Sequence, residues 1–296
     1  MQSFRLFRII IFIALLPLSN NQVQGKKNHT RYQVAVCDWM VLKRQKLGEF
    51  SLAKQLGADG VELDMGPLGK RVMFDNKLRD PEQARQFKNM SDSLLVKVPS
   101  VALSGFFAQN FITRNNYLEL VSDCFTTMKI FGSKVAFLPL GGSGNDWKKA
   151  GAEHDSIVCR LHGVGEMARK AGVVVGIRTA ESAEFDIRLL KEVDSKGIKI
   201  YYNFQDAADQ HRDICKELQL LGKKRIAQIH ASNTDSVNLE HDPEINLRSV
   251  RNILDKIGWS GWLVIERSRD VSHIKDVKYN YGNNVKYIKK VFTQSN

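Results

Sequence analysis

The chain has 296 residues and a formal net charge of +12, with 43% hydrophobic and 26% charged residues. Its lysines and arginines are scattered, and no basic motif interleaved with aromatic residues stands out, so the charge indicates a solvated surface and argues against nucleic-acid binding. The four cysteines, Cys37, Cys124, Cys159 and Cys215, have no CxxC spacing. This excludes a zinc site built from thiolates, and four cysteines are too few for a disulfide framework, so we expect buried free thiols.

The N-terminus, residues 1–25, has the features of a secretory signal peptide. Two arginines precede an apolar run of ten residues, 9–18, and a polar segment ends at Gly25. The run is too short to span a bilayer, and neither a lipid-anchor cysteine nor a later apolar span follows it. We therefore expect an exported protein, periplasmic or secreted, without a stable membrane anchor. Its mature net charge would be +10, and residues 26–296 are predicted to form a single domain.

Short apolar runs rich in β-branched residues recur along the rest of the chain. They start roughly 25 to 40 residues apart, the length of one βα unit. Runs without polar alternation suit strands that are buried on both faces, which indicates a parallel sheet. The eight predicted strands are 33–37, 60–64, 94–98, 134–138, 173–177, 198–202, 226–230 and 262–266.

Amphipathic stretches between these strands predict helices, and five of them lead into a glycine of the kind that ends a helix in the left-handed conformation. These helices are predicted at 50–56, 118–131, 157–170, 213–221 and 250–257, with Gly57, Gly132, Gly172, Gly222 and Gly258 after them. The alternation predicts an α/β fold, a (β/α)8 TIM barrel. A doubly wound open sheet is the alternative, but the segment after the first strand lacks the required glycine fingerprint.

Polar residues end several of the predicted strands, and in such a barrel these ends meet at one mouth. Glu266 ends the eighth strand, where a carboxylate can coordinate a hard cation or act as a general base; an ion pair with a neighbouring arginine is the alternative. His230 ends the seventh strand and suits metal coordination or proton transfer, with a hydrogen-bonded core histidine as the alternative. Arg178 and Asn203 end the fifth and sixth strands.

Further candidates lie near the same mouth. Glu62 and Asp64 in the second strand share one face, so at least one is expected to face the mouth. Arg178, Arg267 and Trp39 are expected to contact substrate. Aromatic residues in the predicted strand-end loops could stack on sugar rings or simply pack within the loops; they are Trp39, Phe106, Phe107 and Trp147.

Three segments resemble the xylose isomerase-like TIM-barrel family, which contains sugar phosphate isomerases and epimerases. They are GADGVELD at 57–64, LGKKRIAQIH at 221–230 and IGWSGWLVIE at 257–266. The resemblance implies a divalent metal held by Glu, Asp, His and Glu after strands five to eight. In this chain His230 and Glu266 match the last two positions.

The other two positions depart from the family, because Arg178 stands at the first and Asn203 at the second. One possibility is a metal (Mn, Mg, Co or Zn) on Glu266, His230 and Asn203, with Glu181 or Asp206 supplying a further carboxylate. The other is that no metal binds and Arg178 fills the vacancy, paired with Glu266 and Glu62. No organic cofactor is expected.

The resemblance implies an isomerase or epimerase that removes a proton next to a carbonyl group. Glu266 is the expected base, His230 the ligand or acid, and Glu62 a second base. Because export disfavours phosphorylated cytosolic metabolites, the expected partner is a small unphosphorylated carbohydrate or keto-sugar. Isomerase, epimerase and lyase share this first step. The alternative is a carbohydrate-binding or accessory barrel with a degenerate metal site and no catalysis.

Overall fold

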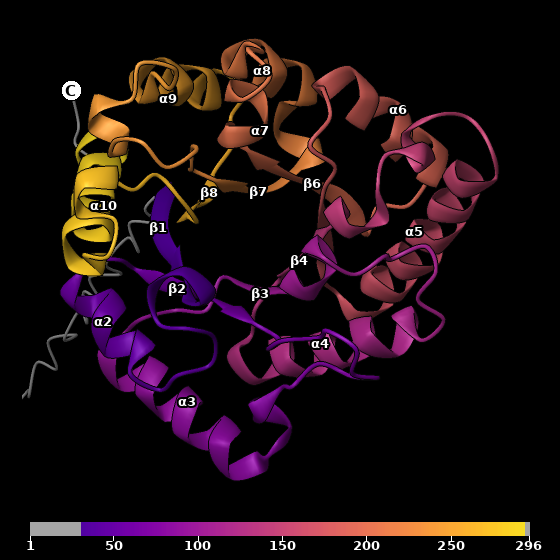
Figure 1. The fold of residues 1–296 in the computed structure, drawn as a ribbon, viewed down its shortest axis with the longest axis horizontal. Helices are drawn as coiled ribbons and strands as arrows, with labels where there is room; N and C mark the ends of the chain where they lie inside the picture. Colours follow the sequence, from indigo (N-terminus) through magenta and orange to yellow (C-terminus); the bar gives the residue numbers. More distant parts are fainter. Residues whose placement is uncertain (1–30, 294–296) are drawn as a thin grey trace, which may run out of the picture.

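A computed structural model describes residues 31–293 as a closed barrel of eight parallel strands. Neighbouring strands follow the chain order, and β8 closes the barrel by pairing with β1 (Figure 1). The strands are β1 Tyr32–Cys37, β2 Gly60–Asp64, β3 Ser100–Ala102, β4 Val135–Pro139, β5 Val174–Arg178, β6 Ile198–Asn203, β7 Ile226–His230 and β8 Gly261–Ile265. The predicted (β/α)8 barrel is confirmed, whereas the predicted signal peptide lies outside the described residues.

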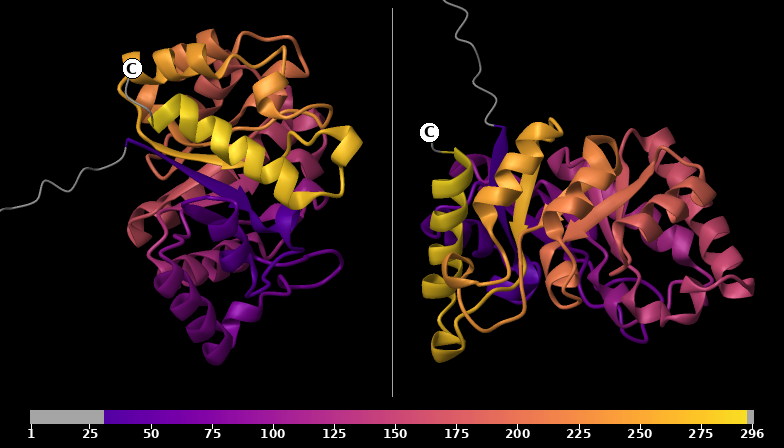
Figure 2. Two further views of the ribbon diagram at one scale, coloured as in Figure 1. Left: turned by 90° about the vertical axis from the view of Figure 1, so that its left-hand side faces the viewer. Right: turned by 90° about the horizontal axis from the view of Figure 1, so that it is seen from above.

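Helices surround the barrel and connect its strands (Figure 1). The longer ones are α2 Glu49–Gln55, α3 Pro81–Leu94, α4 Tyr117–Phe131, α5 Ala152–Ala171, α6 Ala183–Val193, α8 Ile214–Arg225, α9 Leu247–Lys256 and α10 Val277–Thr293, and the short α1 Asp38–Val41 and α7 Phe204–Ala208 follow β1 and β6. In Figure 2, α10 runs along the outside of the barrel, where Lys289 pairs with Asp59 at 2.6 Å beside β2. None of the described helices is long and apolar enough to cross a membrane.

The helices that the sequence predicted are those followed by a glycine, and two helices without such a glycine were missed. All five predicted glycines have positive φ, from 62° to 78°, but Gly222 lies at a non-helical kink inside α8 and not after its last residue. Two helices that were not predicted, α3 and α6, end instead at Leu95 and Asp194, whose φ angles are 56° and 45°. Because these left-handed residues are not glycines, the sequence rule could not find them.

The third predicted strand, 94–98, is wrong. Leu94 is the last residue of α3, and β3 is the shorter segment Ser100–Ala102. Lys97 forms only an isolated bridge with Gly60, and the following Pro99 has no N–H to continue a regular ladder. The alternation of apolar residues around Val96 therefore reflects burial in a loop rather than a strand.

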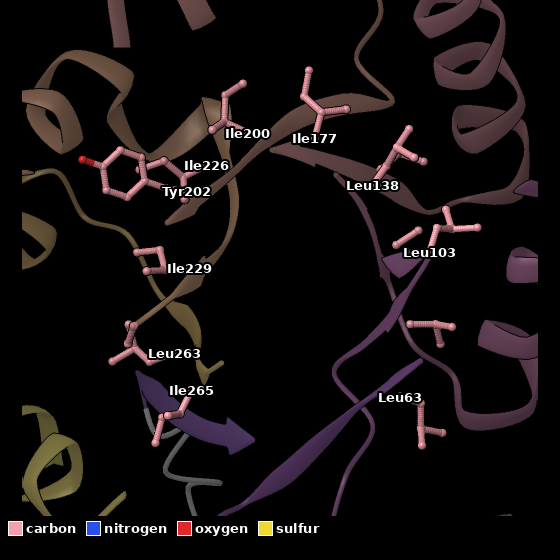
Figure 3. Close-up of a cluster of buried hydrophobic side chains, with 14 of the residues drawn as sticks. Leu63, Leu103, Leu138, Ile177, Ile200, Tyr202, Ile226, Ile229, Leu263 and Ile265 are labelled. Atoms are coloured by element: carbon pink, nitrogen blue, oxygen red, sulfur yellow. The ribbon is translucent and has the colours of Figure 1, made fainter. Parts of the chain in front are cut away.

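Side chains on the two faces of the strands have different surroundings. Outward-facing aliphatic residues pack under the helices (Figure 3); they include Leu63, Leu103, Leu138, Ile177, Ile229, Leu263 and Ile265. Two small separate clusters hold Ala35, Cys37 and Val264, and Ala102, Phe137 and Tyr201. Among the buried polar side chains of these strands are Glu62, Ser100, Gln228 and His230. Their hydrogen bonds to one another define the site described next.

The cysteines are all free thiols, as predicted, but they are not all buried. Cys37 and Cys124 are buried, whereas Cys159 is exposed and Cys215 partly exposed. Both lie on outer helices, so helical position alone did not determine burial.

Candidate active site

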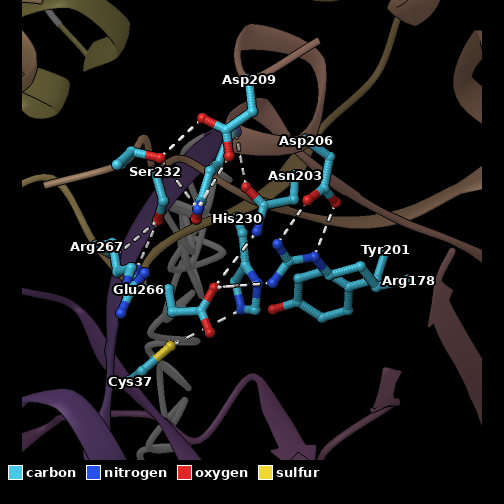
Figure 4. A network of polar contacts seen from close by, with 12 residues as sticks. Cys37, Arg178, Tyr201, Asn203, Asp206, Asp209, His230, Ser232, Glu266 and Arg267 are labelled. Carbon is cyan, nitrogen blue, oxygen red and sulfur yellow. Dashed lines mark hydrogen bonds and ion pairs between the residues drawn. The ribbon is translucent and has the colours of Figure 1, made fainter. Parts of the chain in front are cut away.

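Arg178, at the end of β5, lies between two carboxylates at the carboxyl-terminal mouth of the barrel (Figure 4). Its Nε and Nη2 donate to the two carboxylate oxygens of Asp206 at 2.8 and 2.6 Å, and its Nη1 donates to Glu266 Oε2 at 3.3 Å. Burial disfavours a charged guanidinium, but the hydrogen bonds and charge of Asp206, with the charge of Glu266, raise the pKa of Arg178. The mouth therefore contains a fixed positive charge.

His230, at the end of β7, has different surroundings at its two nitrogens. Nε2 lies 2.8 Å from Glu62 Oε1, and Nδ1 lies 3.6 Å from Glu266 Oε2. Nδ1 is buried and has no hydrogen-bond partner within residues 31–293. The ring packs against Tyr201 and Phe137, with centroids 4.4 and 4.7 Å away. The imidazole is thus held in one orientation, with Nδ1 beside Glu266.

Glu62, on β2, is fully buried inside the barrel and is surrounded by donors. Ser100 and Tyr201 each donate to Oε2 at 2.5 Å, while His230 and Cys37 approach Oε1. Burial alone would raise the pKa of the Glu62 carboxyl, but the charge of His230 and these hydrogen bonds outweigh it and lower the pKa. Because both carboxylate oxygens of Glu62 already accept hydrogen bonds, the geometry favours a role for Glu62 in orienting His230 over its predicted role as a second base.

Cys37, Glu62 and His230 also form a group that could hold a metal ion, since their ligand atoms all lie within 4.8 Å of one another. A thiolate, a carboxylate and an imidazole suit zinc. Here, however, Glu62 Oε1 already lies at hydrogen-bonding distance from both partners, and burial together with the charges of Glu62 and Glu266 raises the pKa of Cys37. A metal ion at this inner group would have to displace the thiol proton of Cys37 and the hydrogen shared between His230 and Glu62.

The predicted metal ligands at the mouth are Glu266, His230 and Asn203, and the structure brings them together. Asn203 Oδ1, however, accepts the backbone N–H of Gln205, so its amide turns Nδ2 toward Glu266 Oε2 at 3.3 Å. Oε2 of Glu266 therefore receives N–H groups from both Asn203 and Arg178. Glu266 Oε2 and Asn203 Oδ1 are thus engaged with N–H donors, and among the described residues these three side chains leave a hard cation only Glu266 Oε1 and His230 Nδ1.

The positive charge of Arg178 also disfavours a divalent metal ion beside Glu266. A divalent ion about 2.1 Å from Glu266 Oε2 would lie no more than about 5.4 Å from Arg178 Nη1, because the latter is 3.3 Å from that oxygen. Their repulsion is roughly 6 kcal/mol or more at an effective dielectric of 20. Arg178, Asp206 and Glu266 together carry a net charge of −1, against −3 for the family's two glutamates and aspartate. These residues do not fit the family's metal arrangement.

Other predicted contacts are corrected by the structure. Arg178 pairs with Asp206 and Glu266, and not with Glu62. Glu181 pairs with Lys148 at 2.7 Å, so neither it nor Asp206 is a spare ligand. Asp64 accepts from Arg44 at 3.0 Å and is buried, and the predicted substrate contact Arg267 is exposed at the mouth.

The aromatic candidates divide into two pairs. Phe106 and Trp147 are fully buried, and they pack against Phe111 and Phe185, so they cannot stack on a ligand. Trp39 is partly exposed and stacks on Phe137 with 2° between the ring planes. Phe107 is partly exposed, and the Arg178 guanidinium carbon lies 5.4 Å from its ring centroid. Trp39 and Phe107 thus remain as candidates for contact with a sugar.

Sequence reasoning missed the deeper residues of the network. Gln228 donates to Ser100 and Tyr201 at 2.7 Å, which in turn donate to Glu62. Strand alternation carried a signal for Gln228, which lies two residues before His230 on β7 and so shares its face.

A closed parallel barrel with titratable residues at the carboxyl ends of its strands is the architecture of TIM-barrel enzymes. The family model described as xylose isomerase-like TIM barrel matches residues 50–291, so the chain belongs to this family. A search of the curated proteins found no match.

Solved structures with the same fold include several sugar epimerases. The D-psicose 3-epimerase of Clostridium cellulolyticum H10, solved with D-tagatose, has 13% identity and a TM-score of 0.69, covering 88% of this chain and 99% of that one. The 3-keto-D-glucoside 4-epimerase of E. coli has 14% identity, a TM-score of 0.69 and the same coverage. An L-ribulose 3-epimerase has 13% identity and a TM-score of 0.69, with 88% and 95% covered. At these identities the likeness shows the fold.

Proposed function

We propose that this chain is an exported isomerase or epimerase that removes a proton next to a carbonyl group in an unphosphorylated carbohydrate or keto-sugar. The observation that carries the proposal is the position of Glu266. Its Oε2 is held by Arg178 and Asn203, while Oε1 makes no hydrogen bond among the described residues. A carboxylate fixed through one oxygen and open at the other is placed to accept and return a proton.

The neighbouring side chains have complementary roles in this proposal. His230 Nδ1 would bind a substrate hydroxyl or, when protonated, supply a proton. Trp39 and Phe107 would pack against the sugar ring. The sugar epimerases with the same fold support the substrate class. The divalent cation that the resemblance implies has no part in this proposal, because the residues at the mouth do not fit it.

Export is supported by the sequence of residues 1–25. Unphosphorylated sugars are the expected substrates because a periplasmic or secreted enzyme does not meet phosphorylated cytosolic metabolites. N-terminal sequencing of protein recovered from the periplasm or medium checks this part. We expect a chain that begins after Gly25, and full-length protein retained in the cytoplasm would contradict it.

Solvent exchange tests the chemistry directly. The mature protein is incubated in D2O with free ketoses, aldoses and keto-glycosides, and deuterium at the carbon next to the carbonyl is followed by NMR. We expect incorporation that the matched Glu266→Gln variant lacks. A wild-type protein that binds a sugar but exchanges no proton would contradict the enzymatic proposal.

That result would favour the second candidate, a carbohydrate-binding or accessory barrel without catalysis. The specific observation in its favour is that Arg178 and Asn203 stand where the resemblance implies Glu and Asp. Calorimetric sugar binding without isotope exchange is its expected signature.

A further inference from the structure

We infer that Arg178 replaces the divalent cation at the barrel mouth, so that the protein needs no metal there and presents a guanidinium to the carbonyl oxygen of its sugar. This inference rests on the proposed function for the substrate, but its electrostatic part stands on the structure alone. It assigns the substrate to sugars with a free carbonyl group, since only a carbonyl oxygen can take up the negative charge when the neighbouring carbon loses its proton.

The first support is the number of donors that Arg178 retains. A guanidinium has five N–H groups, and three of them go to Asp206 and Glu266. One N–H on Nη1 and one on Nη2 have no partner in the part of the chain that the structure describes. The side chain is 14% exposed and lies against the partly exposed Phe107, so it is reachable from the mouth. An oxygen could therefore bind Arg178 without breaking its existing pairs.

The second support is that the guanidinium group of Arg178 is fixed in one orientation. Asp206 binds Nε and Nη2 with both oxygens, which fixes the guanidinium plane. A preorganised cation stabilises developing negative charge most effectively, because it does not have to reorient during the reaction. Asp206 is thus a positioning residue, and Arg178 is the group that contacts substrate.

The proposed step balances without a further reactant. Glu266 Oε1 takes the proton from the carbon next to the carbonyl, and the C–H electron pair becomes the carbon–carbon double bond of an enediolate. The carbonyl π electrons move onto oxygen, which accepts hydrogen bonds from Arg178. Return of the proton from Glu266 to the former carbonyl carbon, with the hydroxyl proton moving from the second oxygen to the first, gives the isomeric carbonyl sugar and the starting carboxylate.

Metal binding tests the electrostatic part independently of activity. We expect purified wild-type protein to contain far less than one Mn, Mg, Co or Zn per chain and to show no rise in Tm with added Mn²⁺. The Arg178→Glu/Asn203→Asp double variant restores the charges that the resemblance implies, and its Tm should rise with Mn²⁺. Asn203→Asp alone is the matched control and should not respond, because Arg178 is still present.

Exchange kinetics test the catalytic part. We expect Arg178→Gln to lower the deuterium exchange rate by roughly 10²- to 10³-fold, the usual effect of removing one oxyanion donor. Arg178→Lys keeps the charge but loses the bidentate fork to Asp206, and should recover only part of that rate. The effect should fall on kcat more than on KM. Because a smaller folded fraction would also lower kcat, the variants are compared below their Tm, and the partial recovery in Arg178→Lys separates the loss of a donor from a loss of folded protein.

Distinct results would overturn the inference at the mouth, place a metal elsewhere, or separate the electrostatic part from the enzymatic part. One bound metal per wild-type chain that disappears in Glu266→Gln would mean that the mouth is a metal site despite Arg178. Metal that disappears in Cys37→Ser would place it at the inner group of Cys37, Glu62 and His230. If wild type is metal-free and the double variant gains Mn²⁺ binding but no sugar exchanges deuterium, the charge replacement holds and the enzymatic function fails.

Discussion

Nε2 of His230 lies 2.8 Å from Oε1 of Glu62 inside the barrel, and this hydrogen bond determines which imidazole nitrogen faces the mouth. Because the pKa of Glu62 is lowered, its carboxylate can only accept, so Nε2 carries the donated hydrogen. Nδ1 is then left beside Glu266 without a hydrogen-bond partner among the described residues. The buried Glu62 thus orients the imidazole so that His230 Nδ1 is the nitrogen that we expect to contact the substrate.

Replacing Glu62 with Gln should disturb this arrangement at nearly constant volume. The new amide brings two N–H groups among the donors His230, Ser100 and Tyr201, so at least one of these donors loses its buried acceptor. We expect the exchange rate to fall about 10- to 100-fold, as for other residues that orient a functional histidine. Unfolding free energy should fall by about 1–3 kcal/mol.

Urea denaturation and NMR exchange would measure the two effects of Glu62→Gln. Ser100→Ala is the control, because it removes one donor and leaves the carboxylate charge, and its effects should be smaller. Wild-type exchange and stability in Glu62→Gln would show that His230 does not depend on this hydrogen bond.

The raised pKa of Asp186 should make the unfolding free energy depend on pH. Burial raises the pKa of its carboxyl from 3.8 to about 8; the charge of Glu217 acts in the same direction, and the Thr179 hydrogen bond opposes both. Between those values the folded protein holds a proton that the unfolded chain has lost. The contribution of Asp186 is therefore fully present below pH 3.8 and is lost as pH rises through about 8.

In this window the unfolding free energy should fall by about 1.4 kcal/mol per pH unit for the single proton. Urea denaturation across the window would measure the slope, and Asp186→Asn should remove this share of it while leaving the share of other buried acids with a raised pKa, such as Asp64. Glu184→Gln, at an exposed acid in the same helix α6, is the control; because the pKa of Glu184 is lowered from 4.5, this variant should leave the slope above that pH as in wild type. An unchanged slope in Asp186→Asn would mean that this carboxyl is ionised in the folded protein.

Phe106 and Phe107 are adjacent in sequence but should have opposite phenotypes. Phe106 is buried against Phe74 and Phe111, so Phe106→Ala should lower the unfolding free energy by about 3–5 kcal/mol. Phe107 is partly exposed beside Arg178, so Phe107→Ala should raise the KM or Kd for a sugar and change stability much less. Thermal denaturation and calorimetry separate the two, and equal loss of stability in both would argue against a ligand contact at Phe107.

Two glycines of α5 test the packing of this helix on the barrel. A Cβ at Gly165 would lie 2.5 Å from Ser195 Oγ and 2.9 Å from Ile198 Cγ1, whereas one at Gly163 would meet only Tyr117 OH, at 3.9 Å. Gly165→Ala should therefore destabilise the protein by about 1–3 kcal/mol. Gly163→Ala should be neutral or stabilising by up to about 1 kcal/mol, because alanine favours the helix. Urea midpoints of the two variants would decide, and equal midpoints would contradict the close approach.

Local pattern was enough to predict the architecture. Apolar runs bounded by glycines reveal strands and helix ends, because both depend on neighbouring residues and on backbone conformation. The same pattern identified His230 and Glu266, since a polar residue that ends a barrel strand must lie at the mouth. It failed for the segment 94–98, where burial mimics a strand, and for helices α3 and α6, which end without glycine.

What the sequence by itself determined is therefore the barrel and the set of polar residues at its mouth. Only the tertiary structure decided which of them interact. Arg178 and Glu266 are 88 positions apart, and Glu62 and His230 are 168 apart. Their contacts depend on barrel closure and side-chain direction, which no local pattern encodes. For this reason only the tertiary structure identified the partners of Arg178, and these partners carry the argument against a metal at the mouth.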